Sequence, residues 1–385
     1  MKKLFLITFA LLSLTSFSQN TQQFFFGRTT GALPFLEYGI GDDRLGGAKM
    51  TYLDSNILLK VVDSFKTKYK VQLSKFRAAY IDKKNLVSPV PGTIEHLTGS
   101  WKVYGDSVYD YVTISLNEKL PYSSIQEIDP TRLVVEIFGA ESNTNWITQV
   151  STTKEIKNAY YEQTEEDVMR VIIDLKHKQH WGHRIYYEGN KLIIRIKRQP
   201  EKPEFKYLTI AVDAGHGGEN HGADGVTSKV LEKDYTLLIA KELRTALVKK
   251  KGNVIMTREK DTTLGMPERI EFLKQACPDM LISIHLNSSD VDTIQGVSTY
   301  YRYIGFRPLS VAILHRMMDT GLKEYGNVGA FNFSLSGPTD YPNCLVEVAF
   351  LSNKEDEKKI LNPAFHKIVA RKIVEGIEDF LKSLN

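Results

Sequence analysis

The chain has 385 residues, of which 42% are hydrophobic and 25% are charged, and its formal net charge is +4. This length exceeds the usual size of one hydrophobic core, so two or three domains are expected, and the composition is that of a globular protein. The charge is small, and no dense Lys and Arg run is interleaved with aromatic residues, which argues against a nucleic-acid-binding protein. A mildly basic chain suits an anionic polymer or membrane surface.

The N-terminus has the pattern of a secretory signal peptide. Lys2 and Lys3 precede an apolar run over 4–14, and small residues follow at Ser16 and Ser18. We therefore predict a signal peptide over 1–18, with export to the periplasm and full secretion as the alternative. The run is too short to span a bilayer, and no later stretch is long and apolar enough for a transmembrane segment in the mature protein.

Residues 24–88 predict a small β-barrel-like domain. Short runs of β-type residues alternate with turn signals such as Gly46-Gly47. The region resembles the Src-homology-like barrels of bacterial wall proteins, and a purely structural β-domain is the alternative. Ser88-Pro89-Val90-Pro91-Gly92 is expected to be a linker, since Pro and Gly oppose both helix and central strand.

Residues 100–198 predict a second β-rich domain. The segment 111–116 alternates polar and apolar residues, and 132–137 is apolar enough for a buried strand. This order of strands, with Asp129-Pro130-Thr131-Arg132-Leu133-Val134-Val135 inside it, resembles the AMIN domain. That resemblance implies a non-catalytic module that binds the cell wall. The three histidines His177, His180 and His183 are expected to lie at a strand-to-strand loop rather than to bind a metal, because no Cys or carboxylate nearby completes a ligand set.

After a linker at 199–203, the pattern changes to alternating strands and helices. Strands are expected over 208–212, 254–256, 280–284 and 345–348, with amphipathic helices over 234–250 and 363–381. Residues 205–385 are therefore predicted to form an α/β domain. Its twisted sheet would be mostly parallel, with helices on both faces.

Functional residues of such sheets collect at the carboxyl ends of strands, and four candidates lie there. His216 is in the loop 213–218, whose glycines make room for it; the loop lacks the Lys-Ser/Thr of a phosphate loop. Glu232 begins a predicted helix, where it could instead serve the helix dipole. His285 follows an apolar strand and could be a buried structural histidine. Glu347 lies inside a buried strand, which is costly for a carboxylate unless it is paired or functional.

Two His and one Glu form the ligand set of a catalytic zinc site, and a further Glu is the usual general base. Spacing alone leaves this assignment open, since the four residues come from separate loops.

These segments resemble the zinc-dependent N-acetylmuramoyl-L-alanine amidases, a family often found behind AMIN domains. The matching segments run in the family's order: Asp213-Ala214-Gly215-His216-Gly217-Gly218, Gly222-Ala223, Glu232-Lys233-Asp234, Thr257-Arg258, 264–269, Ser283-Ile284-His285-Leu286-Asn287 and Leu345-Val346-Glu347-Val348-Ala349-Phe350-Leu351-Ser352-Asn353. The resemblance implies that His216, Glu232 and His285 bind Zn²⁺ and that Glu347 is the catalytic carboxylate. This chain departs from the family at Ala214, where many members have Pro, and at Asn220, where Asp is common. It also departs at 333–337, a segment that lies near the substrate cleft in the family.

The expected function is zinc-dependent hydrolysis of the amide bond between N-acetylmuramic acid and L-alanine in peptidoglycan, the expected partner. Two alternatives are open: a zinc peptidase acting on the stem peptides, or an inactive wall-binding protein. Only Ser288 to Gln295 separates two matching segments that some relatives join by a plugging helix, so activity without an activator is expected. Arg258 and Arg269 are expected to be structural ion-pairing residues, and Cys277 and Cys344 to be unpaired.

Overall fold

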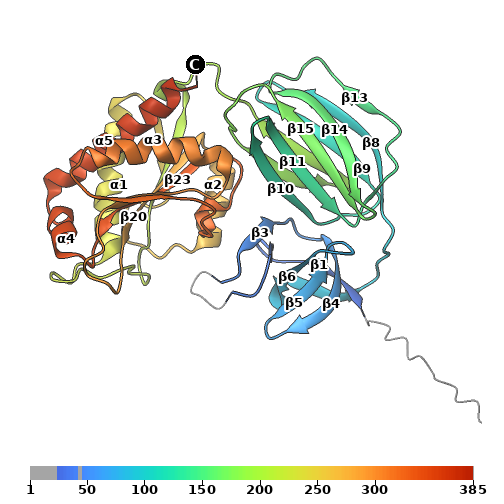
Figure 1. The fold of residues 1–385 in the computed structure, drawn as a ribbon, viewed down its shortest axis with the longest axis horizontal. Coiled ribbons are helices and arrows are strands. Elements are labelled where there is room, and N and C mark those ends of the chain that lie inside the picture. The colour runs from blue at the N-terminus through green and yellow to red at the C-terminus, as the bar shows by residue number, and fades with distance from the viewer. Residues whose placement is uncertain (1–23, 42–45, 385) are drawn as a thin grey trace, which may run out of the picture.

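The computed structural model describes residues 24–41 and 46–384, and its strands fall into three groups along the chain (Figure 1). The predicted signal peptide over 1–18 lies outside the described residues. None of the described helices has the length and apolar character needed to cross a membrane.

The N-terminal unit is one seven-stranded antiparallel sheet of order β3-β2-β6-β5-β4-β1-β7. Its strands are β1 (Phe25–Thr29), β2 (Phe35–Glu37), β3 (Lys49–Tyr52), β4 (Leu58–Phe65), β5 (Lys68–Gln72), β6 (Ala78–Asp82) and β7 (Leu86–Val90). The prediction of a linker from Ser88 was wrong, because Ser88, Pro89 and Val90 belong to β7, which pairs with β1. Since β7 is an edge strand, a proline there removes no ladder hydrogen bond from a central strand.

The second unit is a pair of sheets around a common apolar core. One sheet has the order β10-β11-β15-β14, and the other has the order β12-β8-β9-β17-β16, with β13 beside β8. In β9, every second residue from Asp110 to Leu116 is buried, which confirms the predicted alternation over 111–116. The strands are β8 (Leu97–Gly105), β9 (Tyr109–Leu116), β10 (Tyr122–Ile128), β11 (Thr131–Phe138), β12 (Glu141–Ser142), β13 (Ile147–Gln149), β14 (Ile156–Glu165), β15 (Val168–Leu175), β16 (His183–Glu188) and β17 (Lys191–Lys197).

The C-terminal unit has a six-stranded sheet of order β19-β18-β20-β23-β21-β22. The strands are β18 (Thr209–Ala214), β19 (Asn253–Met256), β20 (Met280–Asn287), β21 (Val297–Tyr300), β22 (Glu324–Val328) and β23 (Asn343–Phe350). β19, β18, β20 and β23 are mutually parallel, whereas β21 runs antiparallel to β23 and β22 runs parallel to β21. Four of the five strand pairings are therefore parallel, in line with the predicted sheet, and the antiparallel pairing of β21 with β23 makes the sheet mixed. The loop 288–296 contains no helix and is shorter than the dozen or more residues of a parallel crossover, so the chain returns in the opposite direction.

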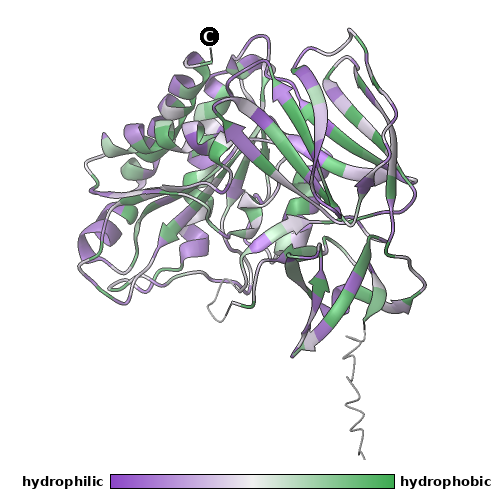
Figure 2. Cartoon of the chain, turned by 45° about the vertical axis from the view of Figure 1, so that its right-hand side comes forward, coloured by the Kyte–Doolittle hydropathy of each residue, from purple (hydrophilic) through white to green (hydrophobic). Residues whose placement is uncertain are grey.

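Helices cover both faces of this sheet. On one face, Ile239, Leu243 and Ile373 pack with strand residues such as Val212 and Ile282 in one core. On the other face, Ile270 and Leu273 pack against Ala211 and Leu281. The first core uses α1 (Glu232–Lys249), α3 (Arg307–Met318) and α5 (Pro363–Lys382), with α4 (Lys354–Ile360) beside them, and the second uses α2 (Met266–Ala276). The predicted apolar stripe of the closing helix is buried along its length, and Figure 2 shows the resulting alternation of hydrophobic and hydrophilic residues on helices and strands.

Short 3-10 turns occur at η1 (Lys83–Asn85), η2 (Phe205–Tyr207), η3 (Ile304–Phe306) and η4 (Ser334–Ser336). The region around η4 meets the N-terminal unit. Asn332 accepts a hydrogen bond from the Lys49 amide at 3.0 Å and donates one to the Gly47 carbonyl at 2.9 Å. Backbone groups of the N-terminal unit thus anchor the segment of the C-terminal unit around Asn332.

Candidate metal centre

The loop after β18 is built for close packing around His216. A Cβ atom at Gly215 would lie 2.4 Å from the His285 ring, and one at Gly222 would lie 2.4 Å from the Glu232 carboxylate. Any side chain at these two positions would collide with a candidate ligand. The glycines therefore serve the approach of three polar side chains, as expected from the absence of phosphate-loop residues.

Three of the four predicted site residues meet at one point. Glu232 Oε1 lies 3.1 Å from His216 Nε2 and 3.0 Å from His285 Nδ1. One ligand atom from each residue lies within 4.8 Å of the other two, and this is the only such group among residues 24–41 and 46–384. β18 and β20 are parallel neighbours, so their carboxyl ends bring His216 and His285 to the same edge.

Backbone groups orient the Glu232 carboxylate. Its Oε2 accepts a hydrogen bond from the Ala223 amide at 2.8 Å, and its Oε1 accepts one from the Leu286 amide at 3.0 Å. Burial alone would raise the pKa of Glu232, but hydrogen bonds with His216 and His285 outweigh burial and hold the pKa of this carboxyl below its usual range. The site therefore contains an ionised carboxylate beneath two imidazoles.

The donor set fits a zinc ion. Two imidazole nitrogens and one carboxylate oxygen, with the remaining position open to solvent, are the donors of catalytic zinc sites. The His216 side chain keeps 22% of its surface exposed, so the group can be reached from outside. His285 Nε2 is buried and has no hydrogen-bond partner in the described part of the chain. Buried polar atoms are normally paired, so this ring fits a site that a further bound species completes.

Asn220 orients His216, a role that the sequence analysis did not predict. Its Oδ1 lies 2.8 Å from His216 Nδ1, so Nδ1 is occupied and Nε2 faces Glu232. Such outer contacts set the tautomer and direction of a metal-binding histidine. Asn220 makes this contact through its amide oxygen, which is a hydrogen-bond acceptor.

Two buried arginines support the loop from below. Arg269 forms an ion pair with Asp213 at 2.5 Å and donates to the carbonyls of Ala214 and His216. This is the structural ion pairing expected of Arg269. Arg258 instead donates to the carbonyls of Ala214 and Gly215, at 3.0 and 2.9 Å, so its expected ion pair is replaced by carbonyl contacts.

Glu347 lies next to the group without belonging to it. It sits on β23 opposite His285 on one side and Ser298 on the other, and partners in register on adjacent strands point to the same face of a sheet. Burial raises the pKa of Tyr300, and the nearby Glu347 carboxylate raises it further. The Glu347 carboxylate thus borders the three-residue group from the neighbouring strand.

An aromatic side chain, Phe333, packs against the metal-centre residue His285. The Phe333 ring meets the His285 ring edge-on with centroids 5.4 Å apart. Phe333 follows Asn332, which the N-terminal unit holds at Gly47 and Lys49. The residue next to Phe333 in the chain is therefore anchored by a contact between units.

The three histidines of the second unit do not converge. His177 Nδ1 lies 2.6 Å from Glu155, His180 Nε2 lies 2.7 Å from the Glu127 carbonyl, and His183 Nε2 lies 2.9 Å from Ser124 Oγ. His177 and His180 lie in the loop between β15 and β16, as predicted, and His183 is the first residue of β16. Both cysteines are free, as expected, and burial raises the pKa of the Cys344 thiol, which disfavours a nucleophilic role.

The comparisons with known proteins divide the chain in the same way. The model of the N-acetylmuramoyl-L-alanine amidase family matches residues 210–379, and the AMIN domain model matches residues 101–196. The probable cell wall amidase LytH of Staphylococcus epidermidis is 32% identical over 179 residues, which are 46% of this chain and 60% of that protein. The LytH of Staphylococcus aureus is 31% identical over 184 residues, 48% of this chain and 62% of that protein. The chain thus spans about 60% of the length of these curated relatives.

Among solved structures, an N-acetylmuramoyl-L-alanine amidase from Clostridium difficile 630 is 32% identical. The match covers 46% of this chain and 98% of that one, with a TM-score of 0.45. The catalytic domain of CwlV from Bacillus (Paenibacillus) polymyxa is 30% identical, covering 46% and 99% of the two chains, with a TM-score of 0.44.

Proposed function

We propose that this chain, whose residues 210–379 belong to the N-acetylmuramoyl-L-alanine amidase family and whose residues 101–196 form an AMIN domain, hydrolyses the amide bond between N-acetylmuramic acid and L-alanine in peptidoglycan. The observation that carries the proposal is the convergence of His216, Glu232 and His285, with Glu347 on the adjacent strand. A wall polymer substrate also fits a mature protein exported to the periplasm.

His216, Glu232 and His285 would hold the zinc ion. When bound, zinc supplies the Lewis acidity that activates water and stabilises negative charge on a carbonyl oxygen. Asn220 keeps the His216 ring turned so that Nε2 faces the carboxylate. The backbone amides of Ala223 and Leu286 keep the Glu232 carboxylate in place.

Glu347 would act as the general base and then as the general acid. Its carboxylate takes a proton from the attacking water as the lactyl amide carbonyl is attacked. It then gives that proton to the nitrogen of L-alanine as the C–N bond breaks. The position of Glu347 opposite His285 supports this role, because the base must lie beside the metal ligands rather than among them.

The segment between β20 and β21 supports activity without a partner protein. Residues 288–296 form a loop with no helix that could occupy the metal centre. We therefore expect the purified mature protein to be active alone. Activity that appears only after a partner protein is added would contradict this expectation.

Mass spectrometry of products tests the proposal. Purified peptidoglycan is digested with mature protein, with and without a zinc chelator. We expect free stem peptides that begin at L-alanine, lost on chelation and restored by zinc. Cleavage inside the stem peptides would indicate the zinc peptidase, and zinc binding with retention on the wall but no product would indicate the inactive wall-binding protein.

A further inference from the structure

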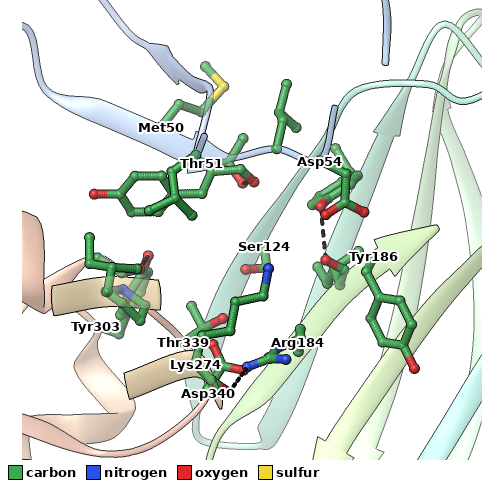
Figure 3. A pocket seen from close by; sticks show the side chains of 18 of the residues that line it. Met50, Thr51, Asp54, Ser124, Arg184, Tyr186, Lys274, Tyr303, Thr339 and Asp340 are labelled. Carbon is green, nitrogen blue, oxygen red and sulfur yellow. Dashed lines mark hydrogen bonds and ion pairs between the residues drawn. The ribbon is translucent and has the colours of Figure 1, made fainter. Parts of the chain in front are cut away.

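A cavity of about 100 Å³ lies where the three units meet (Figure 3). The N-terminal unit contributes Asp54, the AMIN domain contributes Ser124, and the C-terminal unit contributes Lys274, Thr339 and Tyr341. A cavity needs only roughly 10–15 Å³ of such space to hold a water molecule, so this one can accept a molecule of several non-hydrogen atoms. His216, Glu232, His285 and Glu347 do not line it.

Hydrogen bonds between units frame the cavity before any ligand arrives. The His183 amide donates to the Thr339 carbonyl, and the Thr339 hydroxyl donates to the His183 carbonyl, both at 2.8 Å. Arg184 forms an ion pair with Asp340, drawn as a dashed line in Figure 3. The Tyr187 amide donates to Asp54 Oδ2 at 2.9 Å. The walls are thus fixed by polar contacts, as in a pre-formed binding site.

Two opposite charges remain unused at this cavity. Lys274 extends toward Ser124 in Figure 3, and its ammonium has no hydrogen bond or ion pair among the described residues. Asp54 keeps its second carboxylate oxygen without a partner in the same part of the chain, and it forms no ion pair there. The charge of Asp340, by contrast, is matched by Arg184 and by Arg195 at 3.7 Å. The cavity therefore presents one available cation and one available anion.

A third group points to a missing occupant. Tyr341 is 1% exposed, lines the cavity, and has a buried hydroxyl with no hydrogen-bond partner in the described residues. Buried hydroxyls without partners are rare, because such a group has given up its hydrogen bonds to water without replacing them. A polar molecule in the cavity that reached this hydroxyl would satisfy it.

We propose that this cavity is a binding site for a small zwitterion, an amino acid or short peptide that carries both an ammonium and a carboxylate group. The carboxylate would pair with Lys274, the ammonium would pair with Asp54, and the Tyr341 hydroxyl would bond a polar atom between them. Because the charged groups come from different units, the ligand would tie the N-terminal unit to the C-terminal unit. The site assignment does not depend on the proposed hydrolysis, although that reaction would release peptides with this pair of charges.

Binding is tested by isothermal titration calorimetry on full-length mature protein. The probes are L-alanine and L-alanyl-L-alanine as zwitterions, with acetate and methylammonium as single-charge controls. We expect saturable binding of a zwitterion and no measurable binding of either control. The relative affinity of the two zwitterions identifies whether the source is a free amino acid or a peptide end.

Variants locate the site. Lys274→Met and Asp54→Asn should each weaken binding at least about tenfold, since each removes one charge pair. The exposed residues Lys367 and Asp290 provide the matched controls Lys367→Met and Asp290→Asn, which should bind as the unmodified protein does. If Asp54→Asn disturbs the hydrogen bond between Asp54 and the Tyr187 amide, the affinity of Lys274→Met alone tests the site. Absence of zwitterion binding at millimolar concentration, equal binding of acetate, or unchanged affinity in Lys274→Met would overturn the proposal.

Discussion

Histidines occur both in the amidase-family region and in the AMIN domain, but only one set converges. In the first region, His216 and His285 both lie within 3.1 Å of Glu232 Oε1. In the AMIN domain, the three histidines between 177 and 183 each bond a different partner. The residues far apart in sequence share one carboxylate, whereas those close in sequence do not.

The difference follows from the sheets that carry them. Parallel neighbours such as β18 and β20 end at one edge, so residues that follow them meet there. The AMIN histidines lie on the loop before β16 and at its start, where successive residues point in different directions. Convergence on a buried carboxylate, rather than the number of histidines, distinguishes a metal centre from structural histidines.

The largest effect is expected from His285→Ala. The variant removes one of three donors, so zinc binding should fall by more than about 100-fold, beyond the effect of an outer contact, and hydrolysis should be lost. Zinc content by elemental mass spectrometry and product release check this. His183→Gln in the AMIN domain is the control and should keep its zinc. Equal zinc in His285→Ala and unmodified protein would refute the ligand assignment.

Glu347→Gln should separate metal binding from catalysis. Gln keeps the size of the side chain but cannot accept the water proton, so kcat should fall about 10²–10⁴-fold, with zinc content unchanged. Glu324→Gln, at an exposed position of β22, is the matched control and should leave kcat unchanged. If Glu347→Gln instead loses zinc, Glu347 is a ligand and the general base lies elsewhere.

Asn220→Ala should have a smaller effect on the same site. Without the acceptor at 2.8 Å, the His216 ring loses the contact that fixes its direction, and zinc affinity should fall about 10–100-fold. Asn220→Asp keeps an acceptor oxygen and should restore most of that affinity. Competition with a chromogenic chelator measures both variants, and equal losses in Ala and Asp would mean that the contact does not orient His216.

Periodic features of this fold could be predicted, and contacts between units could not. The stripe of α5 and the alternation in β9 are visible in the sequence because burial follows the period of the element. Glu347 could be singled out because a carboxylate inside an apolar strand needs a reason. The β7 strand was missed because prolines at an edge strand look like a linker.

The metal group itself could be assembled only through the family resemblance. The spacing of His216, Glu232 and His285 along the chain does not predict that the three segments meet. The contact of Asn220 with His216 and the hydrogen bond of Asn332 with the Lys49 amide each depend on one side chain in an irregular segment. Such segments leave no periodic signal in the sequence. The cavity around Lys274 needs three separate units to be placed together.

The smallest expected effect concerns the pH dependence of the AMIN domain. Burial lowers the pKa of His183 to about 3, from an ordinary value of 6.5. Below pH 6.5 the unfolded chain takes up a proton that the folded domain refuses until about pH 3, so stability falls as the pH drops through this window. Between pH 7.5 and 5.5 the loss from this residue should be about 1 kcal/mol.

Urea unfolding followed by tryptophan fluorescence measures this loss, because Trp101, Trp146 and Trp181 are the three tryptophans of the chain and all lie in or beside the AMIN domain. His183→Gln should flatten the pH dependence. A histidine held by a metal would respond to a chelator, whereas this slope should be the same with and without one. If the pH dependence of the unfolding free energy were the same in His183→Gln, burial of His183 would not be its cause. The contrast between His183 and His285 would then depend only on which groups their ring nitrogens contact.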